Sequence, residues 1–506
     1  MSSRSRTSMA SPALARVVEL VVHRGVQRVL NGVSETLCQG EVVAIMGENG
    51  SGKTTLIEAF AGLLPLRSGD VIWEENGDSI VIRDSQGRRN QPPPMGLTLQ
   101  KGGVSGDETV MERISVSLSV AGIEHSDHQI MQLLSLWGLE HRASDRLAHL
   151  SGGLRRRVAI LGGLAPAALS KSPMVILLDE PSEGLDESAK DILRCWIRSL
   201  SSRNHAILMA THDKDISSSA DRVLVIKDGS IEEQIGKSLG EVCDLPQSGE
   251  RGNQTPISSL VKWSVKMEVR NPIETVGRVT PALVAILLSY ALLSGQDFQL
   301  QDSRLHASLI LAPAFIAAVS SPALVQRLSE SDCGRWWNAV VGPLARPALS
   351  ITGASILLPI PITYLSWAVL SGTFNGGEYE GVALWLWIPA LALMDLAIAA
   401  TALHLLVSDL SRSSSAPAPL ILVVLVWPFL ELTDALSSIM DNGMSWSLSI
   451  HDPIVSCVVA SLISALVWLA AVMIPDYRLR AFMTNDKFPT IWPTTVPWLF
   501  QLQSPA

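Results

Sequence analysis

The chain has 506 residues, of which 47% are hydrophobic and 17% charged, and it carries a net charge of −9 at pH 7. Of its 39 basic and 48 acidic residues, only 18 fall between positions 276 and 475, and no lysine occurs between Lys266 and Lys487. A polar half is therefore followed by an apolar half with the composition of a lipid-embedded domain. This split excludes a wholly soluble enzyme, a disordered chain and a small disulfide-rich scaffold.

The composition also argues against nucleic-acid and metal-cluster chemistry. The sequence has no long basic run, so no nucleic-acid partner is expected. The five cysteines are scattered without a CxxC pair, so buried thiols are expected rather than a metal site or disulfides. Residues 1–16 are rich in serine and arginine and lack the apolar core of a signal peptide, which predicts a short disordered tail.

The first motif is a glycine-rich loop after an apolar run. Residues 17–46 read as strands, and the last of them, Glu41–Met46, is of the buried type. It leads into Gly47–Thr55, which fits the P-loop pattern GxxxxGK[ST], and a helix is predicted to follow. Glycines let backbone amides approach phosphates, and the helix N-terminus favours negative charge. The predicted nucleotide-binding residues of this loop are Gly47, Asn49, Gly50, Ser51, Gly52, Lys53, Thr54 and Thr55.

A second apolar run, Met174–Leu178, ends in Asp179 and Glu180. A buried strand would deliver Asp179 to Mg²⁺ and Glu180 to the attacking water. The alternative is that the two carboxylates only cap the next turn, which the P-loop upstream disfavours.

Between these motifs lies Leu150–Arg157, with the sequence LSGGLRRR. At this point the chain resembles the ATP-binding-cassette (ABC) ATPases, in which an LSGG signature lies between the P-loop and the acidic pair. Further matches are Gln100 with the Q-loop glutamine, residues 182–186 with the D-loop, and His212 with the switch histidine. The resemblance covers roughly residues 17–235 and implies an α/β P-loop ABC ATPase domain.

The resemblance also implies an assembly and a set of roles. Such ATPases bind two ATP molecules between two head-to-tail cassettes, so this chain needs a second copy or a paralogue, and a homodimer is expected. The implied cofactors are ATP and Mg²⁺. Glu180 is expected to be the general base, and His212 is expected to steady the γ-phosphate and the water. Outside the P-loop, the implied nucleotide-binding residues are Gln100, Ser151, Gly152, Gly153 and Asp186. The implied metal ligands are Thr54, Gln100 and Asp179.

The chain departs from the family pattern at two places. Leu154 stands where the signature usually continues with glutamine, which we expect to be tolerated because the phosphate contacts come from the preceding residues. Where many cassettes stack an aromatic side chain on adenine, this chain has His23 and Arg24. Either residue could stack on the base or be an ordinary loop residue.

A polar stretch ends the cassette and forms a tether up to about Thr255. The apolar spacing of residues 257–270, with nearby lysines and arginine, then predicts an amphipathic helix. Such a helix either lies at the cytoplasmic face of a membrane or packs on the cassette.

Six apolar stretches are long enough to be spanning helices. Their ranges are 277–295, 306–326, 347–371, 382–407, 416–433 and 453–475. Positive charge flanks them on alternate sides, which predicts a multi-pass protein of the cell membrane with both termini in the cytoplasm. The flanking basic residues are Lys262, Lys266, Arg270, Arg278, Arg327, Arg335, Arg346, Arg412, Arg478, Arg480 and Lys487.

Several charged residues, histidines and methionines of the apolar half have two interpretations each. The loop 327–346 is the expected contact with the cassette, near Gln100, or it only orients the helices. Asp395 within the fourth span either contacts a substrate or forms a hydrogen bond between helices. Histidines and methionines near the span ends could ligate haem iron, although each is more typical of ordinary packing. These residues are His306, His404, His451, Met440 and Met444.

A cassette followed by six spans is the layout of a half-transporter. The apolar half is similar to the permease of the haem-export complex of cytochrome c maturation, so the chain resembles a fusion of its two subunits (the CcmA–CcmB type). The matching stretches are 268–272, 311–327, 344–347 and 420–435. The resemblance implies haem export, or release of a haem-loaded chaperone, with a haem-handling membrane protein and a haem chaperone as partners besides membrane lipid.

Two other functions stay open. One is an ABC-2 type exporter of lipid, drug or another hydrophobic molecule. The other is a device that uses ATP to reshape a membrane partner, which the lack of a large extracytoplasmic domain disfavours. This chain lacks the tryptophan-rich motif of haem-handling proteins, which argues against direct haem binding.

The predicted fold is thus an α/β P-loop ABC ATPase domain followed by an all-α six-helix transmembrane domain. The predicted domains are a tail (1–16), the cassette (17–235), a linker with the amphipathic helix (236–275), the permease (276–475) and a cytoplasmic C-terminal tail (476–506).

Overall fold

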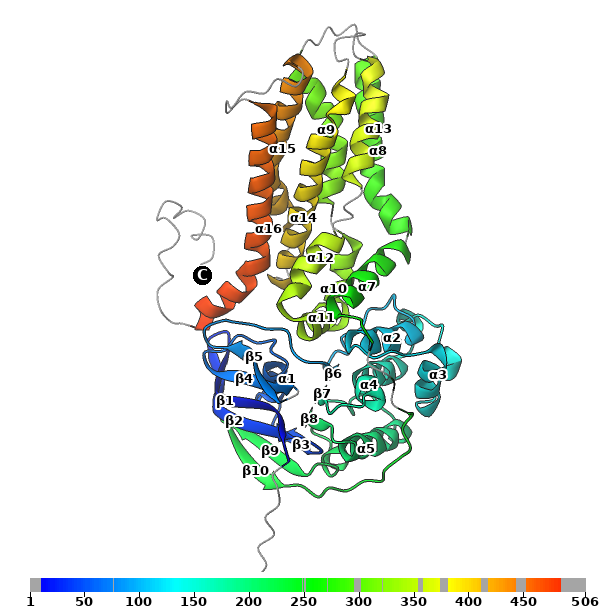
Figure 1. Cartoon of the computed structure of the whole chain (residues 1–506), viewed down its shortest axis with the longest axis vertical. Helices are drawn as coiled ribbons and strands as arrows, with labels where there is room; N and C mark the ends of the chain where they lie inside the picture. The colour runs from blue at the N-terminus through cyan, green and yellow to red at the C-terminus, as the bar shows by residue number, and fades with distance from the viewer. Residues whose placement is uncertain are drawn as a thin grey trace, which may run out of the picture.

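The computed structural model describes residues 11–75, 77–247, 249, 252–270, 272–294, 302–320, 322–353, 358–373, 381–410, 417–442 and 452–483. Several predicted features lie outside these residues: positions 1–10 and 484–506 of the two tails, Arg412, Met444, His451 and Lys487. The side chains of Arg278, Arg478 and Arg480 are likewise outside the description. An α/β domain and a helical domain are stacked along the long axis of the molecule, which confirms the predicted fold class (Figure 1).

The N-terminal domain contains two sheets. An antiparallel sheet has the strand order β2-β1-β4-β5, and a six-stranded sheet has the order β10-β9-β3-β8-β7-β6. In the second sheet every neighbouring pair is parallel except β9 and β10. The strands are β1 (Ala13–Arg24), β2 (Gln27–Cys38), β3 (Val42–Met46), β4 (Ser68–Glu75), β5 (Asp78–Asp84), β6 (Met95–Thr98), β7 (Val175–Asp179), β8 (Ala206–Ala210), β9 (Arg222–Lys227) and β10 (Ser230–Ile235).

The parallel strands bring the predicted motifs together. Strands β3, β7 and β8 are almost wholly apolar because helices cover both faces of a parallel sheet. The P-loop follows β3, the acidic pair Asp179 and Glu180 lies at the end of β7, and His212 follows β8. Since β3, β8 and β7 are adjacent, all three motifs meet at the carboxyl edge of the sheet. The helices of this domain are α1 (Lys53–Phe60), α2 (Val110–Val120), α3 (Asp127–Leu136), α4 (Gly152–Leu169), α5 (Glu187–Ser202) and α6 (Lys214–Ser217).

The expected tether after β10 is held against the N-terminal domain. The Leu239 amide donates to the Ser218 carbonyl at 2.9 Å, and Arg203 donates to the carbonyls of Leu245 and Pro246 at 2.9 and 3.2 Å. We call residues 236–255 the connecting segment. Its described part follows the domain surface toward the helical domain.

The helical domain begins with α7 (Pro256–Arg270). The helices that follow are α8 (Pro272–Ser294), α9 (Ser303–Val319), α10 (Ala323–Ser329), α11 (Cys333–Val341), α12 (Ala345–Gly353), α13 (Pro359–Leu370), α14 (Trp387–Leu410), α15 (Pro417–Asn442) and α16 (Pro453–Met483). Figure 1 shows α7 and α10–α12 at the junction with the N-terminal domain and α8, α9 and α13–α15 beyond it, while the C-terminal end of α16 reaches back toward the N-terminal domain.

The helix boundaries correct one of the predicted spans. The second, 306–326, ends early: α9 stops at Val319, and Pro322 caps the separate helix α10. The third, 347–371, contains α12 and α13, and residues 354–357 between them lie outside the described residues. Among the described residues, three helical stretches are long and apolar enough to cross a membrane, and Val279–Ser294 is apolar but shorter. Those stretches are Ser303–Gly353, Trp387–Val407 and Pro453–Met473. The count of six spans stays a prediction.

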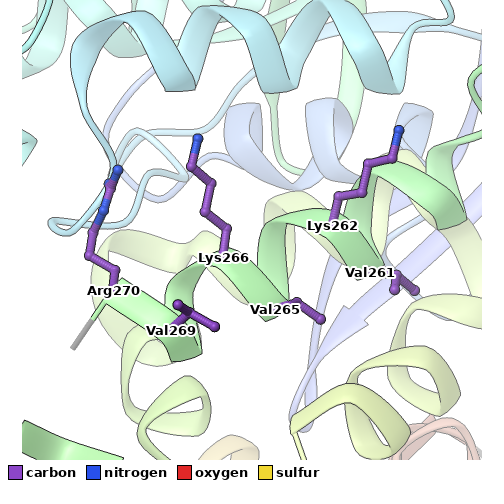
Figure 2. A pocket seen from close by; sticks show the side chains of 6 residues that line it. All are labelled: Val261, Lys262, Val265, Lys266, Val269 and Arg270. Atoms are coloured by element: carbon purple, nitrogen blue, oxygen red, sulfur yellow. The ribbon is translucent and has the colours of Figure 1, made fainter. Parts of the chain in front are cut away.

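Helix α7 packs on the N-terminal domain, the second of the two interpretations of residues 257–270. Its buried face carries Leu260, Trp263 and Met267. On the opposite side, Val265 and Val269 are 49% and 73% exposed and border a shallow apolar depression of about 600 Å³. In Figure 2 the lysines and the arginine of this helix extend away from its valines.

One apolar core crosses the junction of the two domains. It includes Phe60 and Trp73 of the N-terminal domain together with Trp263, Trp336 and Trp337 of the helical domain. Burial of this much aromatic surface is the main stabilising contribution at the junction. The helical domain has a further apolar core of its own, formed by α8, α9 and α13–α16.

Candidate nucleotide site and its contact with the helical domain

The P-loop has the conformation that phosphate binding requires. Gly47, Gly50 and Gly52 all have positive φ values, of 149°, 83° and 113°. A side chain at Gly47 would approach the Ile226 carbonyl to 2.9 Å, so only glycine fits there. Lys53 is 7% exposed, and its Nζ donates to the carbonyls of Gly47 and Glu48 at 3.0 and 3.1 Å. The lysine is thus folded over the loop, at the N-terminus of α1.

The acidic pair of β7 lies against the start of α1. Thr54 Oγ1 donates to Asp179 Oδ1 at 3.1 Å, and Lys53 Nζ is 4.0 Å from Glu180 Oε1. Glu180 Oε2 accepts from the His212 amide at 3.3 Å and lies 2.8 Å from His212 Nδ1. The structure therefore gathers five of the predicted site residues, Lys53, Thr54, Asp179, Glu180 and His212, around one point.

Burial sets the ionisation of Asp179. Its side chain is 1% exposed, and burial raises the pKa to about 6, with the carboxylates of Glu58 and Glu180 adding to the rise. Buried carboxylates close together repel, so this cluster favours a cation.

Two buried atoms at the site are suited to Mg²⁺ and a phosphate. Asp179 Oδ2 and Ser51 Oγ have no hydrogen-bond partner within the part of the chain that the structure describes. Unpartnered buried oxygens are costly unless a ligand satisfies them. Mg²⁺ prefers oxygen ligands, and Thr54 Oγ1 and Asp179 supply two. The residues present therefore fit a magnesium-bound nucleotide. The side chain of Gln100, the third predicted metal ligand, is exposed, and the described contacts do not join it to this pair.

The signature lies away from the P-loop of the same chain. Ser151 is the N-cap of α4, and its Oγ accepts from the Leu154 amide at 3.4 Å. Ser151 and Gly152 are exposed, so their backbone amides are open to an anion from outside. Asp186 is the N-cap of α5 and forms a bidentate pair with Arg157 at 2.5 and 2.7 Å. This pair joins the D-loop to the signature helix.

Arg24, one of the two candidates for adenine stacking, lies beside the P-loop helix. It forms an ion pair with Glu58 Oε2, and its Nε donates to Thr55 Oγ1 at 3.4 Å. Glu58 is 2% exposed, and its other oxygen, Oε1, is 2.5 Å from Arg335 of α11. One buried carboxylate thus joins strand β1, the P-loop helix and the helical domain.

The loop 327–346 contacts the N-terminal domain near Gln100, as predicted. The Gly103 amide donates to the Ser331 carbonyl at 2.8 Å, and Lys101 pairs with Asp332 at 3.7 Å. The Gly106 amide donates to Glu330 at 3.4 Å. These contacts begin directly after Gln100 in the sequence.

An aromatic and ionic cluster fills the centre of this interface. The Trp336 indole donates to the Leu97 carbonyl at 3.2 Å, and its ring lies 3.9 Å from the Arg113 guanidinium carbon. Arg113 and Glu108 are both fully buried, with 3.9 Å between Nη1 and Oε2, and Trp263 donates to Glu108 at 2.6 Å. Burial raises the pKa of Glu108, while Arg113 opposes the rise. Separation of the two domains would remove the contacts of Trp336 and Trp263 and expose the Arg113–Glu108 pair of the N-terminal domain, so the cluster favours the docked state.

Two more arginines bind the edges of the interface. Arg327 is 3% exposed, pairs with Asp107 at 2.6 Å and donates to the Met267 carbonyl at 2.8 Å. Arg270 donates to Glu112 at 2.6 Å. The basic residues expected to orient the membrane helices thus also bind acidic residues in and just before α2.

Sequence reasoning did not find Glu58, Glu108, Arg113, Arg156 or Trp336. Each is defined by partners far away in the chain, and no local motif marks it. The arginine run after LSGG was the only signal, and it pointed to Arg156 without indicating its partners.

The remaining candidates in the apolar half show ordinary packing. His404 Nε2 lies 3.1 Å from the Val319 carbonyl, between α14 and α9. Among the described residues no group of three metal-binding side chains occurs. Asp395 is half-buried, and its Oδ2 has no hydrogen-bond partner in the described part of the chain.

Residues 30–183 match the family model described as ABC transporter. The chain is 32% identical to a putative hemin import ATP-binding protein, HrtA, of Staphylococcus haemolyticus, over 40% of this chain and 90% of that protein. The chain belongs to the ABC transporter family. Its N-terminal domain is an ATP-hydrolysing cassette, and the helical domain follows it.

Other relatives match the cassette within longer proteins. A macrolide export ATP-binding/permease protein, MacB, of Psychrobacter arcticus is 34% identical over 40% of this chain, which spans 30% of that protein. A sulfate/thiosulfate import ATP-binding protein, CysA, of Brucella melitensis is 36% identical over 43% of this chain and 59% of its own length. The solved ATP-binding subunit of an ABC transporter is 25% identical over 44% of this chain and 90% of that chain, with a TM-score of 0.38.

Proposed function

We propose that this chain is an ATP-driven half-transporter whose two copies form the working unit. The observation that best supports this proposal is the interface between the domains. The helices α10 and α11, with the turn between them, bind the segment after Gln100, and Arg335 binds the P-loop helix. A helical domain attached at those two places moves when the nucleotide site changes shape. Dimerisation is supported by the exposed signature at Ser151 and Gly152, which lies away from the P-loop of its own chain.

The site residues take the following roles in this proposal. Backbone amides of the P-loop and Lys53 bind the phosphates. Thr54 and Asp179 would hold Mg²⁺, which would supply positive charge to neutralise the phosphates. Glu180 accepts a proton from the attacking water, and His212, hydrogen-bonded to Glu180, keeps the carboxylate aligned. Gln100 reports the nucleotide to the helical domain, and the signature and Asp186 serve the nucleotide of the partner cassette.

We propose a multi-pass arrangement in the cell membrane, with both termini in the cytoplasm. Arg327 and Arg335 contact the cassette, and the cassette needs cytoplasmic ATP, so the loop that carries them belongs on the cytoplasmic side. The same orientation follows from positive charge in the flanking loops. Closure of the dimer on ATP would be passed through α10 and α11 to the spans, and hydrolysis would reset them.

Two substitutions test the catalytic assignment. Lys53→Ala removes the ammonium from the P-loop and should abolish hydrolysis, whereas Glu180→Gln should bind ATP and stall with the cassettes closed. Measurement of ATP turnover and of nucleotide retention by the purified protein in nanodiscs separates the two. Normal turnover in Glu180→Gln would remove that residue as the base, and normal turnover in Lys53→Ala would remove the P-loop assignment.

For the cargo we propose haem export, or release of a haem-loaded chaperone, in cytochrome c maturation. Support comes from the resemblance of the apolar half to the permease of that system and from the cassette of a relative named for hemin import. The other relatives are named for macrolides and sulfate, so the cassette alone does not choose the cargo. The second candidate is export of a lipid or drug, which the apolar surfaces of the spans favour over sugars.

A haem-stained gel of host membranes distinguishes the two cargoes. A deletion strain would be complemented with wild type or with Glu180→Gln at equal expression. Loss of covalent c-type haem with the variant alone supports the haem proposal. Unchanged staining refutes it and leaves the lipid or drug exporter.

A further inference from the structure

Arg156, the middle arginine of the run after the signature, donates to four backbone carbonyls. Its Nη1 contacts Leu99 and Gln100 at 3.0 and 2.8 Å. Its Nη2 contacts Asp179 and Glu180 at 2.9 and 2.6 Å. One half-buried guanidinium therefore joins the Gln100 segment to both residues of the acidic pair.

The backbone of Glu180 needs such support. Its φ of 47° lies in the left-handed region, which is strained for a non-glycine residue and persists only where the surroundings impose it. Three hydrogen bonds hold the residue there. Its amide donates to the Ala210 carbonyl at 2.9 Å, and its carbonyl accepts from Arg156 at 2.6 Å and from the Glu183 amide at 3.1 Å. This conformation aims the Glu180 carboxylate at His212.

The Nη1 side of the guanidinium is connected to the helical domain through the Gln100 segment. The segment that it holds, Leu99 and Gln100, continues into Lys101 and Gly103, which contact α11 and the turn before it. A shift of α11 therefore displaces the carbonyls that anchor Nη1. Because the guanidinium is rigid and planar, its Nη2 partners must move with it.

We propose that Arg156 is a positioning residue for ATP hydrolysis, which aligns the Glu180 backbone only while the Gln100 segment is seated on the helical domain. The proposal rests on Glu180 as the base. It links the helical domain to the hydrolytic step through one side chain. Burial lowers the pKa of Arg156, yet a guanidinium keeps its charge and all five donors in the cell.

The two-pronged geometry of the Arg156 guanidinium predicts how replacements of this residue behave. Lysine offers one point charge that cannot reach two pairs of carbonyls at once, and glutamine has one amide nitrogen. Both should loosen the Glu180 carbonyl, which would keep only the weaker hydrogen bond from the Glu183 amide. A misplacement of about 1 Å at a reacting group costs roughly 100-fold in rate.

The test compares Arg156→Gln and Arg156→Lys with Arg203→Gln in purified full-length protein in nanodiscs. Arg203 is a matched control, because it also donates to three backbone carbonyls but lies away from the site, at 2.9–3.2 Å from Ala168, Leu245 and Pro246. We expect both Arg156 variants to lower kcat about 10- to 100-fold with the KM for ATP within about threefold of wild type. Arg203→Gln should lower only the thermal midpoint.

A double mutant separates positioning from general destabilisation. If Arg156 acts through Glu180, then Arg156→Gln added to Glu180→Gln should not reduce the residual single-turnover rate further. An Arg156→Gln protein with wild-type kcat, or with KM raised as much as kcat falls, overturns the proposal. Full rescue by lysine also overturns it. If Glu180→Gln itself turns over normally, the base assignment fails, whereas an inactive Glu180→Gln beside an active Arg156→Gln removes only the role of Arg156.

Discussion

Replacement of Trp336 by alanine probes the junction between cassette and helical domain. The indole is 3% exposed, packs on the Arg113 guanidinium and hydrogen-bonds to the Leu97 carbonyl. Truncation of a buried tryptophan to alanine typically costs about 3–5 kcal/mol. The loss here belongs toward the upper end, because Arg113 would stay buried without the face of the ring.

Trp336→Ala should therefore lower the melting midpoint and weaken the coupling between ATP turnover and cargo. For domains of about 150–250 residues, 1 kcal/mol corresponds to about 2–4 °C in the melting midpoint, so a loss of about 5 kcal/mol predicts a drop of about 10–20 °C. Differential scanning of the protein in nanodiscs measures the midpoint, and ATP turnover with and without cargo measures coupling. We expect basal turnover to fall, because the Gln100 segment loses its seat on α11, and the dependence of turnover on cargo to disappear.

Two matched variants sharpen the test. Trp336→Phe keeps a ring over Arg113 but loses the indole donor, so it should cost only about 1 kcal/mol. Trp387→Ala removes a tryptophan that is 49% exposed and should shift the midpoint little. The reasoning is refuted if Trp336→Ala melts within about 2 °C of wild type and remains coupled.

Three further outcomes are expected. Lys53→Ala should abolish ATP turnover, and Glu180→Gln should retain bound ATP without turnover, both measured by phosphate release and filter binding. Glu58→Gln, which loses its charge toward two arginines, should keep basal turnover but weaken its response to cargo, as measured by the stimulation ratio. Burial, and then the charge of Arg203, lowers the pKa of His205 to about 4. Because the unfolded state binds a proton below about pH 6.5, stability should fall between pH 6.5 and 4, by about 2 kcal/mol at pH 5.

For His205 and Glu58, the opposite result would assign the effect to another cause. In His205→Asn an amide oxygen can accept from the Met174 amide without titrating, so the added loss of midpoint at about pH 5 should vanish. An unchanged pH profile in that variant would assign the loss to other groups. A Glu58→Gln protein that responds to cargo like wild type would show that the buried carboxylate only stabilises the fold.

The cassette motifs were predictable because their chemistry is local. A P-loop needs glycines at fixed offsets between a strand and a helix, and an acidic pair at the end of an apolar strand needs only that strand. The loop 327–346 was also placed correctly near Gln100, since charge in an otherwise apolar half has few other uses.

The rest depended on contacts between distant segments. The predicted second span ran on to residue 326 because hydropathy does not distinguish lipid from a protein interface, and α10 buries its apolar residues against other helices and α7. No local pattern in the sequence indicated the partners of Arg156 or Glu58. Their roles follow from carbonyls and guanidiniums that only the folded chain brings together.

The connecting segment changes what the covalent link between the domains contributes. Because it is bound along the cassette, with the Gly249 amide donating to the Leu169 carbonyl and the Gly252 amide donating to the Gly122 carbonyl, it is too restrained to pull on the spans. Its effect is to raise the effective concentration of one domain at the other, which converts docking into an intramolecular step. The covalent link therefore adds to the buried contacts of the junction, and the two domains stay together more firmly than two separate subunits with the same contacts would.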